Sequence, residues 1–99
     1  MSRPPRIVTV EHLGRRQLRL TFSDRVVREL DLTPMLQADV FAPLRDEAMF
    51  AQVSVDPVAG TICWPGGIDL DPDVLHGDFE PASGRAPKVL REYRLRRSA

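Results

Sequence analysis

The sequence has a single cysteine, Cys63, among 99 residues. One thiol can form neither an internal disulfide nor a four-thiolate zinc site, and such cysteine usage is typical of a reducing compartment. No apolar run approaches the roughly 18 residues that a membrane span needs, and no signal-peptide-like stretch follows the basic residues 1–6. We therefore expect a cytoplasmic protein without membrane association.

Aromatic residues are also scarce, at 6% of the chain, and there is no excess of either charge sign. The zero net charge hides an uneven distribution. Residues 1–38 carry seven arginines against four acids (net +3), residues 39–80 one arginine against nine acids (net −8), and residues 81–99 six bases against one acid (net +5). This pattern is either self-complementary or suited to an acidic partner.

What the sequence does contain is the composition of an ordinary globular domain, with 42% apolar and 28% charged residues. Proline, serine, glycine and alanine dominate from residue 78 to 88 and indicate a boundary near residue 80. We predict a single domain over residues 1–80 and a basic tail over 81–99. Residues 88–97 fit a short amphipathic turn that is too brief to be stable alone, so we expect the tail to be mobile.

The clearest local signal is an alternation of period two, in which Leu18, Leu20 and Phe22 point one way and polar residues the other. It predicts a strand with one buried face. Further strands are predicted at residues 7–12, 26–31, 50–55 and 61–64. Arg25 occupies a turn position where a tight hairpin favours glycine, so either the turn is longer than two residues or the site carries about 1–2 kcal/mol of strain, and we predict the longer turn.

Short helices are predicted between these strands. Residues 32–40 and 41–49 each contain a proline near a helix start. Asp71 as N-cap, Pro72 at the first helical position and Gly77 as terminator describe a third helix. The predicted fold class is α+β, an antiparallel sheet of about five strands with short helices on one face and a basic C-terminal tail.

A longer pattern of residues resembles a known family. It comprises Leu-x-Leu-x-Phe at 18–22, Phe-x-x-Leu-Arg-Asp at 41–46, and Gly-Thr-Ile-x-Trp-Pro-x-Gly-x-Asp-Leu-x-Pro-Asp-x-Leu at 60–75. Over about residues 5–76 the chain is similar to the bacterial family known as domain of unknown function 2442. It differs at Arg25, where the family usually has glycine, and at Gly66, which replaces a common asparagine.

The resemblance implies a small α+β domain. Members are sometimes joined to a helix-turn-helix domain, and many are encoded beside another small protein in a toxin–antitoxin-like arrangement. The tail of this chain is too short for a helix-turn-helix domain, which argues against DNA reading by the chain alone.

Four carboxylates match the offsets 1, 3, 5 and 12 of a calcium-binding EF-hand loop: Asp69, Asp71, Asp73 and Glu80. Position 6 of such a loop requires glycine for its sharp turn, and here it is Val74. Helix capping explains Asp71 and Asp73 without a metal, so we predict no metal site and keep the four residues as a cation-binding alternative.

The remaining reactive residues do not assemble into a catalytic set. Cys63 with His12 or His76 would need a depressed thiol pKa and an orienting base, neither of which the sequence indicates. We predict no catalytic residues and no cofactor, and interpret Cys63 as a small core residue. Trp64 fits the core better than an exposed anchor, although an exposed Trp64 would be a strong partner contact.

The leading hypothesis is a non-enzymatic protein-interaction module, the antitoxin-like half of a bacterial two-gene pair, with a small protein as partner. The candidate partner-binding residues are Trp64, Arg91, Tyr93, Arg94, Arg96 and Arg97. The alternatives are a transcription-linked nucleic-acid-binding protein that uses the basic tail, and a cation-dependent protein or enzyme that uses the four carboxylates. An exposed sheet edge could also pair two copies into a homodimer.

Overall fold

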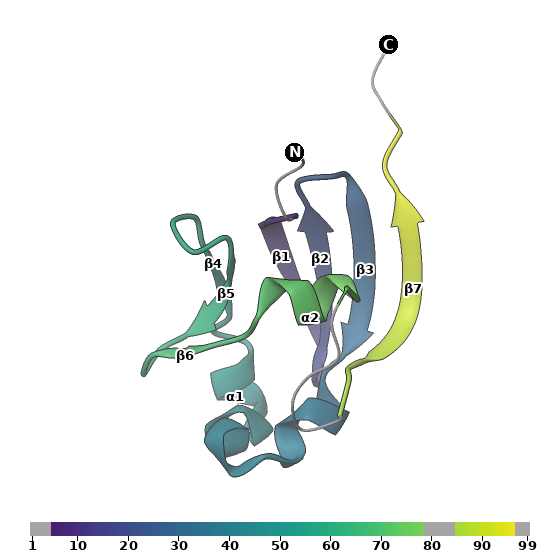
Figure 1. Ribbon diagram of the computed structural model, residues 1–99. Helices are drawn as coiled ribbons and strands as arrows, with labels where there is room; N and C mark the ends of the chain where they lie inside the picture. The colour runs from purple at the N-terminus through teal and green to yellow at the C-terminus, as the bar shows by residue number, and fades with distance from the viewer. Residues whose placement is uncertain (1–4, 79–84, 97–99) are drawn as a thin grey trace.

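The computed structural model describes residues 5–78 and 85–96, which form two antiparallel sheets (Figure 1). The larger sheet has the strand order β1-β2-β3-β7, with bounds Ile7–Gly14, Gln17–Phe22, Val26–Asp31 and Lys88–Arg94. The smaller sheet has the order β4-β5-β6, with bounds Ser54–Asp56, Thr61–Trp64 and Ile68–Asp69. The predicted α+β class with antiparallel strands is confirmed, but the strands belong to two sheets instead of one.

Four short helices lie between the strands: the 3-10 helices η1 (Thr33–Gln37) and η2 (Asp39–Arg45), and the α-helices α1 (Glu47–Phe50) and α2 (Pro72–His76). Figure 1 shows α2 across one face of the larger sheet and the other three near its lower end. None of the helices in the described residues has the length and apolar character to cross a membrane.

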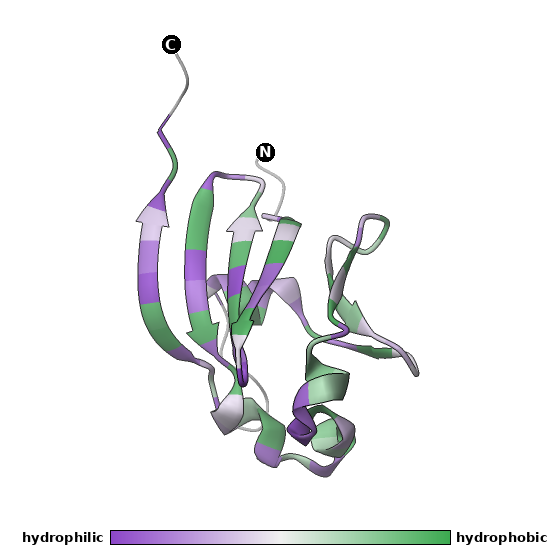
Figure 2. Ribbon diagram, turned by 180° about the vertical axis from the view of Figure 1, so that it is seen from behind, coloured by the Kyte–Doolittle hydropathy of each residue, from purple (hydrophilic) through white to green (hydrophobic). Residues whose placement is uncertain are grey.

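The core lies on the face of the larger sheet that the helices cover. Leu18, Leu20 and Phe22 of β2 are all buried there, as their alternation predicts. Figure 2 shows this alternation as bands of apolar and polar residues along the strands. Phe50 of α1 and Leu75 of α2 join the same buried cluster. Each such side chain contributes about 1.5–3 kcal/mol by leaving water, so this face carries most of the stability of the domain.

The two sheets are joined through the start of β1. The backbone N–H of Ile7 donates to Gly60 O at 2.9 Å. The Nη2 atom of Arg6 donates to the carbonyl oxygens of Pro57 and Val58 at 2.7 and 2.9 Å. Gly60 has a φ of 71°, and a Cβ on it would lie 2.7 Å from Cζ of Arg6. Glycine adopts this left-handed φ without strain, and a larger residue would displace the Arg6 side chain from its place across the turn.

The C-terminal segment differs from its prediction. A helical turn over residues 88–97 is wrong, because residues 88–94 form β7, which pairs antiparallel with β3. The chain thus returns to the larger sheet after α2, and the boundary placed at residue 80 does not separate β7 from the sheet. Residues 81–84 and 97–99 of the expected tail lie outside the described residues.

The turn between β2 and β3 has three residues, Ser23 to Arg25, so the predicted longer turn is confirmed. Arg25 nevertheless has a φ of 73°, in the left-handed region. A three-residue hairpin loop commonly ends in such a left-handed residue, and glycine is the residue that adopts it without strain.

We predict that Arg25→Gly raises the free energy of unfolding by about 0.5–1 kcal/mol. Relief of the left-handed strain, about 1–2 kcal/mol, outweighs the larger backbone entropy that glycine has in the unfolded chain. Urea denaturation measures the change. Arg25→Ala removes the same charge but keeps a Cβ, and it is expected to give no gain. Equal stabilisation by both variants would show that the charge, not the backbone, is responsible.

Candidate interaction site

Strand β7 forms one edge of the larger sheet. Its neighbour is β3, and no strand among the described residues pairs with its other side. Every side chain of β7 is exposed except Tyr93, which is partly buried. Unpaired backbone groups on an exposed strand are a template for binding another strand. This strand is therefore the part of the described structure best placed to meet a partner.

Exposed apolar side chains concentrate at the same edge. Six large apolar residues are exposed in the described part of the chain: Val8, Val40, Val58, Val89, Leu90 and Leu95. The last three, including both leucines, belong to β7 and the residue that follows it. A single exposed leucine is ordinary, but two such side chains on this edge strand and a third directly after it form a local apolar surface.

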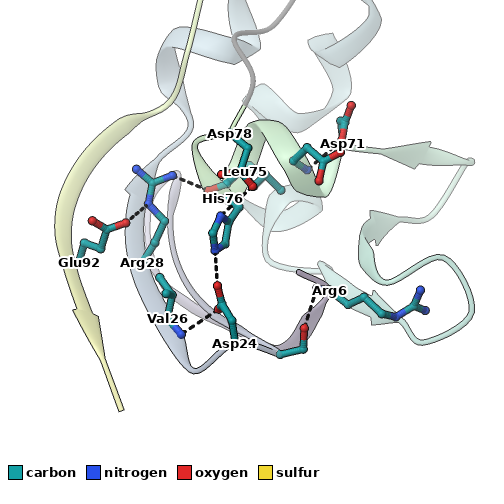
Figure 3. A network of polar contacts seen from close by, with 11 residues as sticks. Arg6, Asp24, Val26, Arg28, Asp71, Leu75, His76, Asp78 and Glu92 are labelled. Carbon is teal, nitrogen blue, oxygen red and sulfur yellow. Dashed lines mark hydrogen bonds and ion pairs between the residues drawn. The ribbon is translucent and has the colours of Figure 1, made fainter. Parts of the chain in front are cut away.

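On the face that the helices cover, β7 is attached through Arg28 of β3 (Figure 3). The Nη1 atom of Arg28 donates to Leu75 O in α2 at 2.7 Å. Its Nε lies 3.0 Å from Oε1 of Glu92 in β7, an ion pair without the angle of a hydrogen bond. One buried guanidinium thus contacts the sheet, the helix and the edge strand.

On the opposite face, a row of alternating charges crosses all four strands. Glu11, Arg19, Glu29 and Arg91 are successive cross-strand neighbours. Arg19 forms ion pairs with Glu11 and, at 3.1 Å, with Glu29, and Arg91 lies 3.9 Å from Glu29. The guanidinium of Arg91 also lies 4.6 Å from the centre of the Tyr93 ring. These contacts favour one register of β7 on β3.

A second polar contact fixes α2 to the turn between β2 and β3. The ring of His76 bridges two carboxylates, with Nε2 at 2.8 Å from Asp24 and Nδ1 at 3.0 Å from Asp78 (Figure 3). The same ring packs edge-on against Phe22, with 4.7 Å between ring centres. Sequence reasoning missed this contact, because 52 residues separate His76 from Asp24.

The surroundings of Asp24 change its acidity. Partial burial on its own raises the pKa of the carboxyl group. The N–H of Val26, the hydrogen bond and charge of His76, and the charge of Arg94 together outweigh burial, so the pKa lies below its ordinary value of 3.8. The folded state therefore favours the ionised form of Asp24.

The predicted partner-binding residues do not share one surface. Trp64 is 3% exposed, and its Nε1 donates to Phe50 O at 2.9 Å, so it is a core residue and presents no exposed anchor. Arg94 and Arg96 are exposed at the β7 edge, beside Arg91 and Tyr93. Arg97 lies outside the described residues.

The carboxylates after Trp64 shape the backbone. Asp71 is the N-cap of α2, and its Oδ1 accepts a hydrogen bond from the N–H of Asp73 at 2.9 Å. Pro72 follows at the first turn and Gly77 ends the helix at a φ of 98°, as predicted. Asp69 is exposed on β6, and Glu80 lies outside the described residues. No group of three potential metal ligands occurs within residues 5–78 and 85–96.

Cys63 and His12 occupy structural positions. The Sγ of Cys63 on β5 lies 3.7 Å from Oγ of Ser54 on β4. His12 packs edge-on against Phe50, at 5.6 Å between ring centres, and its Nε2 lies 2.9 Å from Arg15 O. The structure brings neither residue into contact with a catalytic partner among the described residues.

A basic hollow of about 440 Å³ lies near the β1–β2 turn and includes Arg15, Arg16 and Arg45 in its lining. Arg45 donates from Nε to Leu36 O at 2.7 Å and from Nη2 to Gln37 O at 2.9 Å. Arg16 in turn donates to Arg45 O. Two of the three guanidiniums thus hold neighbouring loops together, which makes the hollow a weaker candidate than the β7 edge.

The chain matches a known protein family. Residues 7–80 match the model of a family described as protein of unknown function (DUF2442), and this range covers well over half of the 99 residues. The chain belongs to the DUF2442 family. Neither curated proteins nor solved structures give a match. The range matched by the DUF2442 model includes the core and both sheets apart from β7.

We predict that Asp24→Asn lowers the free energy of unfolding at pH 7 by about 1 kcal/mol, because charge-assisted contacts are lost. A carboxylate with a lowered folded pKa contributes stability above its unfolded pKa, and this contribution is lost as pH falls through the folded value. The gap between wild type and Asp24→Asn should therefore narrow below about pH 3.8.

Urea denaturation between pH 7 and pH 2.5 measures this gap. Asp39→Asn, which removes an exposed carboxylate, is the control and should change stability by less than about 0.5 kcal/mol at pH 7. A gap that stays constant down to the lowest pH would contradict the assigned role of the Asp24 charge.

We also predict that Asp71→Ala lowers the free energy of unfolding by about 1 kcal/mol through loss of the N-cap. Calcium or magnesium at millimolar concentration should leave the melting temperature of both wild type and variant unchanged. A calcium-dependent rise in the wild type that Asp71→Ala abolishes would instead support the cation-binding alternative.

Proposed function

We propose that this DUF2442 chain is a non-enzymatic interaction module that binds another small protein at its β7 edge. The observation that supports this is the coincidence of two features on one strand. Its outer side has no neighbouring strand in the described structure, and the strand with the residue after it carries half of the exposed large apolar residues found there. Extended segments of partner proteins commonly bind such edges through backbone hydrogen bonds.

The family supplies the proposed identity of the partner. The resemblance to DUF2442 implies that many members are encoded beside another small protein. We propose that the product of such a neighbouring gene binds this chain, and that this chain is the antitoxin-like half of a bacterial pair. In this proposal the binding surface is the edge of β7, which is paired with β3, and not a mobile tail.

Nucleic-acid binding is the alternative from a different class. Lys88, Arg94 and Arg96 are exposed cations along β7 and its continuation. Leu90 and Leu95 are exposed among them. Aliphatic side chains contribute little to phosphate contacts but favour the buried centre of a protein interface, so the combination favours a protein partner.

We predict that native mass spectrometry detects a defined complex between this chain and the product of the adjacent gene. Leu90→Ser combined with Leu95→Ser should weaken the complex at least about tenfold, because apolar contacts at an interface centre contribute more than about 1 kcal/mol each. Both side chains are exposed, at 41% and 45%, so the double variant should fold normally. Val58→Ser, at an 87% exposed site in the β4–β5 turn, is the matched control.

Failure to form any complex would contradict the interaction role. Binding of a random 20-mer oligonucleotide that weakens steeply with salt, without binding of the neighbouring protein, would favour the nucleic-acid alternative. Deletion of residues 81–99 is a poor test, because it removes β7 from the sheet and uncovers Val27, which lies opposite Tyr93 and is 1% exposed.

A further inference from the structure

We infer that the β7 edge binds an extended segment of the partner that carries both acidic and apolar residues, and that this segment becomes a fifth strand of the larger sheet. This inference rests on the proposed function, which it deepens by naming the chemistry of the partner. The backbone, the charges and the apolar side chains of the edge each support it.

The backbone of β7 can form hydrogen bonds with another strand on its outer side. Pairing with β3 extends from Lys88 to Arg94, and the N–H of Leu95 continues it by donating to Arg25 O at 2.8 Å. In an antiparallel ladder, alternate residues direct their N–H and C=O groups away from the existing neighbour. β3 thus holds one side of β7, with an irregularity at Leu90, while the outward groups have no neighbouring strand among the described residues.

The charges of this edge are mostly of one sign. Residues 88–96 include four basic side chains and one acid, Glu92. Glu92 pairs with Arg28 on the helix-covered face at 3.0 Å. Glu29 lies 3.9 Å from Arg91, and the charge of Arg94 acts on Asp24, but the segment itself keeps three more bases than acids. A strand added beside β7 would lie about 4.8 Å away, at which distance opposite charges attract and like charges repel across the pair. The excess positive charge of β7 therefore favours acidic side chains on the added strand.

The same surplus argues against a second copy as the occupant. Two β7 strands paired edge to edge would bring two segments of net positive charge into contact. Like charges on neighbouring strands are destabilising, and charged edges are a common means of preventing self-association. An acidic segment removes this repulsion and gains attraction instead.

The apolar residues of the edge favour apolar residues on the added strand as well. Val89 is opposite Leu30 of β3, and Leu90 sits at the irregularity between Val89 and Arg91. With Leu95 they provide apolar positions near both ends of the edge. Val89 and Arg94 lie opposite the core-facing Leu30 and Val26 of β3, whereas Arg91 and Tyr93 lie opposite Glu29 and Val27 on the other face. An added strand therefore meets cationic and apolar side chains on both faces of the sheet, and we expect it to carry acidic and apolar residues on both.

The geometry also disfavours single-stranded nucleic acid. Stacking of bases needs an open aromatic face, and Tyr93 is the aromatic residue of this edge. Its ring already lies against the guanidinium of Arg91, at 4.6 Å. Binding of a base there would have to displace that contact.

The test uses the full chain and synthetic nine-residue peptides with blocked ends. One peptide combines glutamate with valine and leucine, a second has lysine in place of glutamate, and a third carries N-methyl groups on alternate residues of the acidic peptide. A 12-mer oligothymidine is the nucleic-acid probe. Amide chemical shifts and hydrogen exchange of the isotopically labelled protein are followed by nuclear magnetic resonance at pH 7.

We expect the acidic peptide to bind saturably, to shift amides of β7, and to slow their exchange. Lys88→Glu combined with Arg94→Glu should weaken binding about tenfold, since two cross-strand attractions become repulsions. Arg15→Glu with Val58→Ser, which alters exposed residues away from β7, should leave binding unchanged. Higher salt should weaken binding, because the charges are exposed. The lysine peptide and the N-methylated peptide should bind at least about tenfold more weakly.

Several results would overturn the inference. Equal binding of the lysine or N-methylated peptide would exclude acidic strand addition, and tighter binding of oligothymidine would assign the edge to nucleic acid. Protection of β7 that appears with protein concentration alone would identify a second copy as the occupant. If the neighbouring protein binds but β7 charge variants bind it normally, the inference fails while the interaction role stands. If no protein binds, the proposed function fails as well.

Discussion

One buried cation, the guanidinium of Arg28, connects the three parts of the structure that meet around β3. A charge that is only 9% exposed is costly unless polar groups surround it. Here the carbonyl oxygen of Leu75 and the carboxylate of Glu92 supply that surrounding, one from α2 and one from β7. Gly77 makes the approach feasible, because a Cβ there would lie 2.9 Å from Nη1 of Arg28. Helix, sheet and edge strand therefore depend on a single side chain, and a change in any of them alters the surroundings of a buried charge.

This dependence explains how β7 can be ordered while burying little of its own surface. A strand that contributes few apolar contacts must be held by its backbone ladder and by polar contacts on both faces. Arg28 supplies one such contact and the charge row that ends at Arg91 supplies the other. Because these contacts all run toward β3, none of them occupies the outer side of the strand. The features that attach β7 to the sheet thus leave its outer edge available.

Much of the local structure could be predicted because short sequence segments determine it. The alternation around Leu20 and the capping residues Asp71 and Gly77 each define their element within ten residues, and the structure confirms them. β7 was not predictable in this way. The irregularity at Leu90 interrupts the period-two pattern, and the partner strand lies some 60 residues earlier in the chain. His76 and Asp24 are also far apart in the sequence, so their contact could not be predicted from it. The division of the strands into two sheets depends on equally distant contacts and could not be predicted either.

The fold explains the uneven distribution of charge along the sequence. The acids of the middle segment do not neutralise the basic C-terminal strand. Asp46, Asp56 and Asp71 instead accept hydrogen bonds from nearby backbone N–H groups and shape helix starts and a turn. The acids that do pair with arginines of the larger sheet, Glu29 among them, come from the strands themselves. Residues 88–96 therefore keep an excess of positive charge, because these acids of the middle segment accept backbone N–H groups and only acids of β3 and the β2–β3 turn face the arginines of β7.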